Sequence, residues 1–215
     1  IYYLLQHNPN EAIVLLANEV APASAKFLTD LVTGHGGTIQ IIDVKAELAD
    51  IKSLGANRYV SYSTYARFYI PNLLKGQFDR AVYIDSDTLV TDSLEGMKTL
   101  DLHDQPFAIG YDCIFNNYKK LIGIPPTSPY FNAGVLIMDL AKWQKRRCSE
   151  RIFDYMKNVR HDSILGDQDF FALVLSSNAA TLPPQYNFLT HFQMFRRAKD
   201  ARFAAAIPKE CWYSD

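Results

Sequence analysis

The sequence contains few cysteines and no long apolar run, and each absence argues against a class of protein. Its three cysteines, Cys113, Cys148 and Cys211, are far apart and form no Cys-x-x-Cys pair. Neither a disulfide scaffold nor a zinc site is therefore expected, and a reducing compartment fits best. No run of about 18 apolar residues occurs, and no charged segment precedes an apolar signal core. We therefore expect a cytoplasmic protein without a membrane span.

An excess of one charge is also lacking. The 215 residues include 22 Lys and Arg against 23 Asp and Glu, which gives a net charge of -1 and an isoelectric point near 6.6. This balance provides no general attraction to nucleic acid, so no nucleic-acid partner is expected. The sequence has no Gly-x-x-x-x-Gly-Lys-Ser/Thr loop, which counts against a magnesium-dependent nucleotidyl or phosphoryl transferase. It shows no internal repeat, and its length suits one domain.

Apolar runs alternate with helical stretches along the chain, which is typical of an α/β fold. Residues 12–17 and 38–44 are predicted strands, and a helix over 21–31 separates them, as in a parallel β-α-β unit. The other expected elements follow in order: the end of a helix at 1–6, a short helix over 62–71 that ends at Pro71, a strand from 81 that stays extended to 90, strands over 106–112 and 129–140, a loop or lid over 113–129, a basic amphipathic helix over 143–157, a helix over 165–175 with Asp167 as its N-cap, and an extended segment over 181–187.

Two carboxylates follow the apolar residues 81–84. Asp85 and Asp87 alternate with Ser86, so an extended backbone would point both side chains the same way. Ligands of parallel sheets bind beyond the carboxyl ends of the strands, where these residues would lie. Such hard oxygen ligands suit Mn²⁺ or Mg²⁺. An acidic turn after the strand is the alternative that these residues alone leave open.

Other polar residues also stand where a ligand could be bound. Arg67, within an aromatic segment, either forms a surface salt bridge or reaches an anion or a sugar hydroxyl. Asp112 is an acid at the end of the strand over 106–112. Residues 132–134, Asn-Ala-Gly, offer an amide and a backbone that a ligand can approach closely, although a bulge or a tight bend is equally compatible.

The predicted helix over 165–175 begins with three polar residues. Asp167 suits the N-cap and Asp169 suits the positive end of the helix dipole, so a structural role accounts for both acids. Capping leaves Gln168 unexplained.

Five sequence blocks, taken in this order, resemble the bacterial family of retaining glycosyltransferases that includes lipo-oligosaccharide galactosyltransferases, lipopolysaccharide glucosyltransferases and, more distantly, glycogenin (glycosyltransferase family 8). The blocks are 64–67 (Thr-Tyr-Ala-Arg), 83–90 (Tyr-Ile-Asp-Ser-Asp-Thr-Leu-Val), 130–136 (Tyr-Phe-Asn-Ala-Gly-Val-Leu), 166–169 (Gly-Asp-Gln-Asp) and 182–187 (Leu-Pro-Pro-Gln-Tyr-Asn). Their shared order and spacing make the resemblance far more specific than any single block.

This resemblance implies the α/β fold called GT-A, in which helices flank a mainly parallel mixed sheet. It also implies transfer of galactose or glucose from a UDP-hexose donor to a saccharide or glycolipid acceptor, with Mn²⁺, or Mg²⁺ in its place, as cofactor. The metal would be held by Asp85 and Asp87 and would stabilise the charge on the leaving diphosphate. The substrate-binding residues implied by the resemblance are Arg67, Asp85, Asp112, Asn132, Ala133, Gly134, Asp167 and Gln168.

Gln168 and Asp167 are the implied catalytic residues. The resemblance places Gln168 near the anomeric carbon, on the face opposite the leaving group. A neutral amide is a weak nucleophile, which favours a same-face route in which the departing phosphate takes the proton of the acceptor. Asp167 is the candidate nucleophile if a covalent intermediate forms.

Both ends of the chain depart from the family pattern. We expect residues 1–215 to form a single GT-A domain that lacks the first strand and the C-terminal segment with the third metal ligand. His191 is a weak candidate for that ligand, and a truncated or non-catalytic UDP-sugar-binding relative is the alternative. The basic segment 195–203 either makes peripheral contact with the inner face of a membrane or is a solvated surface segment. No oligomeric state is predicted.

Overall fold

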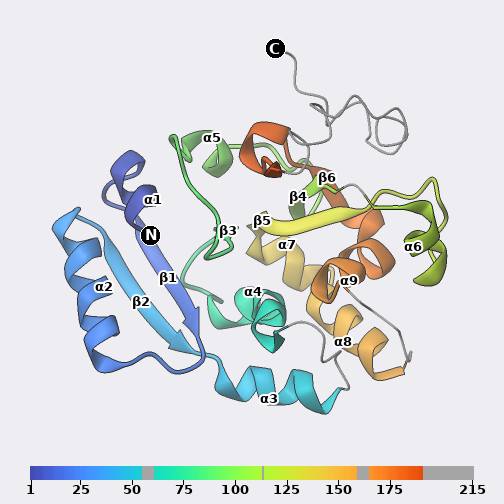
Figure 1. Ribbon diagram of the computed structural model, residues 1–215, viewed down its shortest axis with the longest axis horizontal. Helices are drawn as coiled ribbons and strands as arrows, with labels where there is room; N and C mark the ends of the chain where they lie inside the picture. Colours follow the sequence, from blue (N-terminus) through green and yellow to red (C-terminus); the bar gives the residue numbers. More distant parts are fainter. Residues whose placement is uncertain (55–60, 113, 159–164, 191–215) are drawn as a thin grey trace.

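The computed structural model describes residues 1–54, 61–112, 114–158 and 165–190, and Figure 1 shows their arrangement. Predictions that concern Cys113, Cys211, His191 and the basic segment 195–203 lie outside these residues. The strands within the described ranges form a two-stranded sheet and a four-stranded sheet. No helix in the same ranges is long and apolar enough to cross a membrane.

The N-terminal part is the predicted β-α-β unit. β1 (Ala12–Ala17) pairs in parallel with β2 (Thr38–Asp43), and α2 (Pro22–Gly34) connects the two strands. Gly36 continues the connection with a φ of 77°, in the left-handed region that favours glycine. A Cβ at this position would lie 2.1 Å from Oδ1 of Asn10, so the turn also leaves no space for a side chain.

The larger sheet has the strand order β3-β5-β4-β6. It consists of β3 (Arg80–Ile84), β4 (Phe107–Tyr111), β5 (Phe131–Asp139) and β6 (Ala179–Thr181). β5 is antiparallel to β3 and β4, and β6 is parallel to β4, so three strands run one way and β5 runs the other. The prediction of a mainly parallel mixed sheet is therefore confirmed. The carboxyl ends of β3, β4 and β6 and the amino end of β5 lie at the same end of the sheet.

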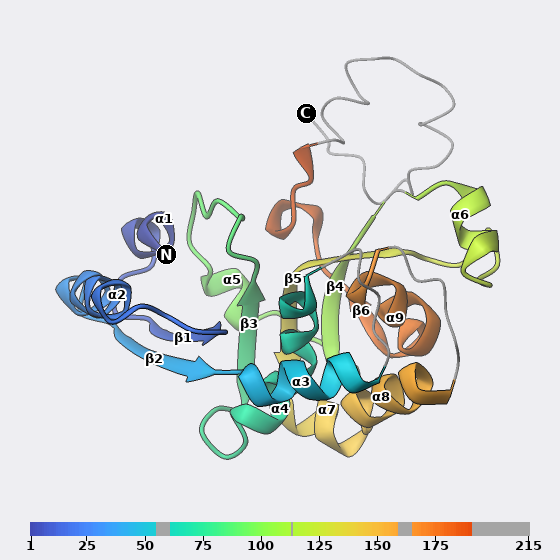
Figure 2. The ribbon, with the colours of Figure 1, turned by 60° about the horizontal axis from the view of Figure 1, so that its bottom comes forward.

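The remaining helices lie around the two sheets. They are α1 (Tyr2–His7), α3 (Lys45–Ser53), η1 (Tyr62–Tyr69), α4 (Ile70–Leu73), α5 (Glu95–Lys98), α6 (Asn116–Leu121), α7 (Leu140–Lys145), α8 (Cys148–Asn158), α9 (Asp167–Val174), η2 (Ser176–Asn178) and η3 (Pro184–Tyr186), where η denotes a 3-10 helix. α9 packs on β5, and α8 packs against α7 and α9 (Figures 1 and 2). The two-stranded sheet lies on the far side of β3 from β5 in both views.

The main core is rich in aromatic side chains. The ring of Phe107 in β4 lies 5.4 Å from those of Trp143 in α7 and Phe171 in α9. Trp143 donates from Nε1 to the Ser149 hydroxyl over 2.8 Å, and that hydroxyl donates to the carbonyl of Phe68 over 2.6 Å. The indole N–H and this hydroxyl are thus both satisfied inside the core, as burial of polar groups requires.

Three predicted elements differ from the observed ones. Pro71 does not end a helix but lies in the first turn of α4, where its missing N–H is not needed. The segment 113–129 is not all loop, because α6 forms between Phe115 and Gly123, a stretch without proline or glycine. The single helix expected over 143–157 is two helices, since Arg147 adopts a φ of 53° between α7 and α8.

Two predictions next to the site are also wrong. β3 ends at Ile84, and the amide of Thr88 donates to the carbonyl of Asp85 over 3.1 Å, so a turn replaces the extended backbone expected up to residue 90. Asp167 is not the N-cap of α9, because Gly166 occupies that position with a φ of 65°. As a result, the Asp167 carboxylate is available for contacts beyond its own helix.

Candidate active site

A bulge at the start of β5 forms the centre of the candidate site. β4 pairs Ile109 with Leu136, but the next residue, Gly110, pairs with Asn132. The intervening residues 133–135 of β5 therefore have no partner in β4. A bulge, which the sequence left open at this position, is present, and bulges redirect backbone and side chains next to active sites.

Backbone groups of the bulge contact several residues predicted for the site. The amide of Ala133 donates to Oε1 of Gln168 over 3.1 Å, and its carbonyl accepts from Nη1 of Arg67. The amide of Gly134 donates to Oδ1 of Asn132 over 3.0 Å, and its carbonyl accepts from the amide of Asp85 over 2.8 Å. The structure thus brings η1, β3, β5 and α9 together at two consecutive residues.

Arg67 is a buried cation between two carboxylates. Its side chain is 3% exposed, so the surface salt bridge that the sequence left open is wrong. Nη2 donates to Oδ1 of Asp85 over 3.1 Å, and Nε lies 3.0 Å from Oδ2 of Asp167. Nε donates to the carbonyl of Thr64 over 2.8 Å, which fixes the guanidinium to its own helix. One positive charge therefore faces two negative charges in a water-poor environment.

Asp167 has an unusual electrostatic environment. Its side chain is 6% exposed, and Oδ2 receives no hydrogen bond from the described residues, because the nearby Nε of Arg67 is directed to Thr64. Burial raises the pKa of the Asp167 carboxyl from 3.8 to about 6, against the attraction of Arg67 and with the repulsion of Asp85. A buried carboxylate oxygen without a donor can accept a hydrogen bond from a ligand.

Tyr83 is a site residue for which the sequence analysis predicted no role. Its hydroxyl donates to Oδ1 of Asp85 over 2.5 Å, and its ring lies 4.6 Å below the guanidinium carbon of Arg67. Burial raises the pKa of the Tyr83 hydroxyl, so this group stays a donor at neutral pH. The sequence feature that could have indicated Tyr83 is its spacing of two residues from Asp85, which places both side chains on one face of an extended strand.

Asp112 and Asn132 meet at the ends of adjacent strands. Nδ2 of Asn132 donates to Oδ2 of Asp112 over 3.3 Å. Nδ2 of Asn187, from the chain that follows η3, donates to Oδ1 of Asn132 over 3.1 Å. Asn187 belongs to the sequence block 182–187, but no role of its own was predicted for it.

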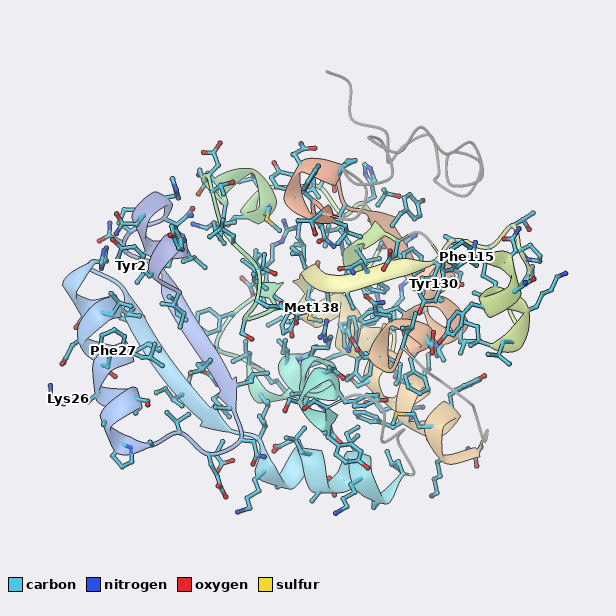
Figure 3. The ribbon with its side chains drawn as sticks, viewed as in Figure 1. Tyr2, Lys26, Phe27, Phe115, Tyr130 and Met138 are labelled. Carbon is cyan, nitrogen blue, oxygen red and sulfur yellow. The ribbon has the colours of Figure 1, made fainter. Side chains whose placement is uncertain are left out.

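Asp169 forms a second buried network that the sequence did not indicate. Its carboxylate is fully buried and accepts from the hydroxyl of Tyr118 in α6 over 2.8 Å and from that of Tyr130 over 2.6 Å. Figure 3 shows Tyr130 where β5 begins, beside Phe115 and α6. The helix dipole therefore gives an incomplete account of this acid, which joins the first turn of α9 to the segment predicted as a lid.

Of the two predicted metal ligands, only Asp85 forms hydrogen bonds with the described residues around Arg67. Asp87 is exposed, and its side chain forms no hydrogen bond or ion pair with Arg67, Asp167 or the β5 bulge in the described part of the chain. Asp85 is 32% exposed, and its Oδ1 already accepts from Arg67 and Tyr83, which leaves Oδ2 for a metal. The described residues contain no group of three His, Cys, Asp or Glu that could hold a metal ion. Two hard carboxylates fit Mn²⁺ or Mg²⁺ as part of a ligand set.

Comparisons with known proteins point to one family. Curated relatives include the glycosyltransferase GlyF of Streptococcus pneumoniae, 25% identical over 92% of this chain and 46% of the relative. The lipopolysaccharide 1,2-glucosyltransferase of Escherichia coli is 25% identical over 80% of this chain and 52% of the relative. The chain thus spans about half the length of these relatives.

Comparison of the fold with solved structures points to the same family. A solved structure of the galactosyltransferase LgtC in complex with donor and acceptor sugar analogs matches with a TM-score of 0.69 and 26% identity, over 94% of this chain and 73% of LgtC. The mixed sheet and its helices therefore form a GT-A fold, as predicted. Residues 1–209 match the family described as Glycosyl transferase family 8. The chain belongs to glycosyl transferase family 8.

Proposed function

We propose that this protein transfers a hexose, galactose or glucose, from a UDP-sugar to a saccharide or glycolipid acceptor with retention at the anomeric carbon. The observation that carries the proposal is the buried Asp167 oxygen that receives no hydrogen bond from any described residue, next to Arg67 and the β5 bulge. Sugar hydroxyls are the natural donors for such an oxygen. The transfer of sugars by relatives such as the lipopolysaccharide 1,2-glucosyltransferase supports the same conclusion.

The donor sugar would lie against the bulge. Asp167 accepts from one sugar hydroxyl, and Asp112 and Asn132 offer further polar groups at the same edge of the sheet. Arg67 keeps Asp167 ionised and in place through its charge at 3.0 Å. Gly134 supports close approach of the sugar, because it leaves the backbone bare between Asn132 and Asp85.

Asp85 and Asp87 would hold Mn²⁺, or Mg²⁺ in its place, beside the diphosphate. Tyr83 and Arg67 both bind Oδ1 of Asp85, so they present the other oxygen of this carboxylate to a ligand. When bound, the divalent cation supplies stabilisation of the negative charge that develops on the leaving diphosphate. Arg67 also orients the Asp85 carboxylate, because its Nη2 donates to Oδ1 over 3.1 Å.

The side chain of Gln168 is fixed in place by a hydrogen bond from the β5 bulge. Its Oε1 accepts from the amide of Ala133, which fixes the side-chain amide at the bulge. A neutral amide is a poor nucleophile, so we favour a same-face route. The bond from the anomeric carbon to the diphosphate oxygen breaks, the acceptor oxygen bonds to that carbon, and the acceptor proton passes to the departing phosphate. Asp167, paired with Arg67, is the alternative nucleophile, and a glycosyl adduct on either residue, found by mass spectrometry, would contradict the same-face route.

The test measures UDP release from UDP-glucose and from UDP-galactose with Mn²⁺ by the full protein that carries this chain. Asp87→Asn should abolish most of the release, because it removes one carboxylate from the metal site. Asp104→Asn is the matched control, since Asp104 is an exposed carboxylate whose side chain is paired with Arg146. Unchanged release in Asp87→Asn would refute the metal assignment. Binding of UDP-sugar without turnover by the unmodified protein would instead support a non-catalytic relative.

A further inference from the structure

We infer that Asn187 is a positioning residue for the donor sugar, because its side chain fixes the orientation of the Asn132 amide and, through it, Asp112. The inference rests on the proposed function, which places Asn132 and Asp112 against the sugar. Asn187 is partly buried, and its Nδ2 donates to the side chain of Asn132.

The backbone of Asn187 is held by the sheet. The amide of Leu182 donates to the carbonyl of Ile109 over 3.0 Å, which extends the pairing of β6 with β4, and the side chain of Leu182 is 1% exposed. The amide of Asn187 then donates to the carbonyl of Pro184 over 3.1 Å and closes η3. These contacts set where the Asn187 side chain begins.

Gly110 provides the space that this side chain occupies. A Cβ on Gly110 would lie 3.0 Å from Nδ2 and 3.3 Å from Cβ of Asn187. Gly110 is also the residue that pairs with Asn132 across the β5 bulge. The bare backbone of β4 therefore lets Asn187 reach Asn132 at the point where the strand register shifts.

The hydrogen bonds determine which way the Asn132 amide faces. Oδ1 of Asn132 accepts from Nδ2 of Asn187 over 3.1 Å and from the amide of Gly134 over 3.0 Å. Nδ2 of Asn187 also lies 3.4 Å from the carbonyl of Asn132. Since two N–H donors meet Oδ1, Nδ2 of Asn132 must face the other way, where it donates to Asp112 over 3.3 Å.

Loss of Asn187 would leave the Asn132 amide with a single donor to Oδ1. The amide could then rotate and turn its oxygen toward the Asp112 carboxylate, where the two groups would repel one another. Because a neutral hydrogen bond contributes a modest net free energy, the expected loss of donor binding is on the order of tenfold.

The experiment compares binding of UDP-glucose and UDP-galactose with binding of UDP alone, by titration calorimetry on the full protein with Mn²⁺. Asn187→Ala should weaken UDP-sugar binding by about five- to tenfold and leave UDP binding unchanged. Asn132→Ala should do the same, and the double variant should bind UDP-sugar no more weakly than Asn132→Ala. Gln185→Ala is the matched control, since Gln185 is an exposed residue of the same segment. A purely structural role would alter UDP binding as well.

Asn187→Asp keeps the volume beside Gly110 and replaces the donor by a carboxylate oxygen that repels Asn132, so it should lose more affinity than Asn187→Ala. If Asn187→Ala does not fold, sugar binding by Asn187→Asp still tests whether Asn187 orients Asn132. Additive losses in the double variant, or wild-type sugar binding in Asn187→Asp, would overturn the inference alone. Wild-type sugar binding in Asn132→Ala would overturn the inference together with the proposed sugar site.

Discussion

The hydroxyl of Tyr130 donates to the carboxylate of Asp169 over 2.6 Å and so joins the start of β5 to the first turn of α9. Both side chains are almost fully buried, with exposed fractions of 1% and 0%. Burial raises the pKa of the Tyr130 hydroxyl and the Asp169 charge raises it further, so the proton stays on the tyrosine. This contact holds the helix start that carries Asp167 and Gln168 against the β5 bulge.

Tyr130→Phe removes only this hydroxyl and keeps the ring. The buried Asp169 carboxylate would lose one charged hydrogen bond, so the free energy of unfolding should fall by about 1.5–3 kcal/mol. Urea denaturation followed by circular dichroism measures the change. Tyr2→Phe is the control, because Tyr2 is 55% exposed in α1 and should change stability by no more than about 0.5 kcal/mol. Equal effects of the two substitutions would show that the Asp169 contact contributes nothing.

Arg67→Lys should cost far more than a conservative exchange normally does. A lysine has a single ammonium group and cannot bind Asp85, the Ala133 carbonyl and the Thr64 carbonyl at once. We expect at least a tenfold loss of kcat/KM for the UDP-sugar and a loss of about 2 kcal/mol in stability from the unpaired buried groups.

Arg146→Lys is the matched control for this exchange. Arg146 pairs with Asp104, whose side chain is 90% exposed, and exposed pairs contribute little. Activity and stability should both stay close to those of the unmodified protein. A similar loss in both variants would argue against a special role of the buried guanidinium.

The raised pKa of Asp167 predicts a pH dependence. An ionised Asp167 carboxylate accepts a hydrogen bond from a sugar hydroxyl more strongly than the protonated acid does, so kcat/KM should rise with pH, with the midpoint of the rise near pH 6. Asp167→Asn should lower activity and remove this rise, as a pH series of UDP release would show. The same rise in the Asn variant would assign the titration to another group.

The raised pKa of Asp167 also affects stability, which should fall with rising pH whereas activity rises. The pKa of Asp167 is raised from 3.8 in the unfolded chain to about 6 in the fold, so its contribution is fully present below pH 3.8 and is lost as pH rises through 6. The stability advantage of the unmodified protein over Asp167→Asn should therefore shrink between pH 4 and 6. Denaturation of both proteins across this window measures the difference, and a growing advantage would contradict the burial argument.

Gly134→Ala tests the space at the bulge. A Cβ at this position would lie 3.0 Å from Oδ1 of Asn132 and 3.2 Å from Oδ2 of Asp85, so both groups must move. UDP-sugar turnover should fall by roughly tenfold or more, because small displacements of active-site groups have effects of this size. Gly34→Ala is the control, because nothing lies within 4 Å of the Cβ it would add, and turnover should not change.

Much of the fold was predictable because local sequence patterns determine it. The apolar run that forms β1 and the β-α-β order were recognised from residues close in sequence. Asp85 and Arg67, which meet at the β5 bulge, were candidate ligand-binding residues from the local sequence, whereas the role of Gln168 was implied by the family resemblance. The structure brings these residues together, and their roles stay predictions.

The remaining features depend on long-range contacts that no local pattern encodes. The shift in register at Gly110 depends on pairing with a strand about twenty residues away in sequence, and the bulge follows from it. The contacts of Tyr83 with Arg67 and of Asp169 with Tyr130 join residues that are distant in sequence, so no local pattern predicts them. Residues after position 190 lie outside the described ranges, so His191 as the candidate third metal ligand stays untested.

The β5 bulge makes the proposed site part of the sheet's own hydrogen bonding. At Ala133 a strand that lies between two neighbours obtains its main-chain partners from the side chains of Arg67 and Gln168 instead of from β4. A substitution at either side chain would therefore leave a central strand with an unpaired amide or carbonyl. Selection for activity and selection for an intact sheet act on the same residues here, so variants that lose one without harming the other should be rare at these positions.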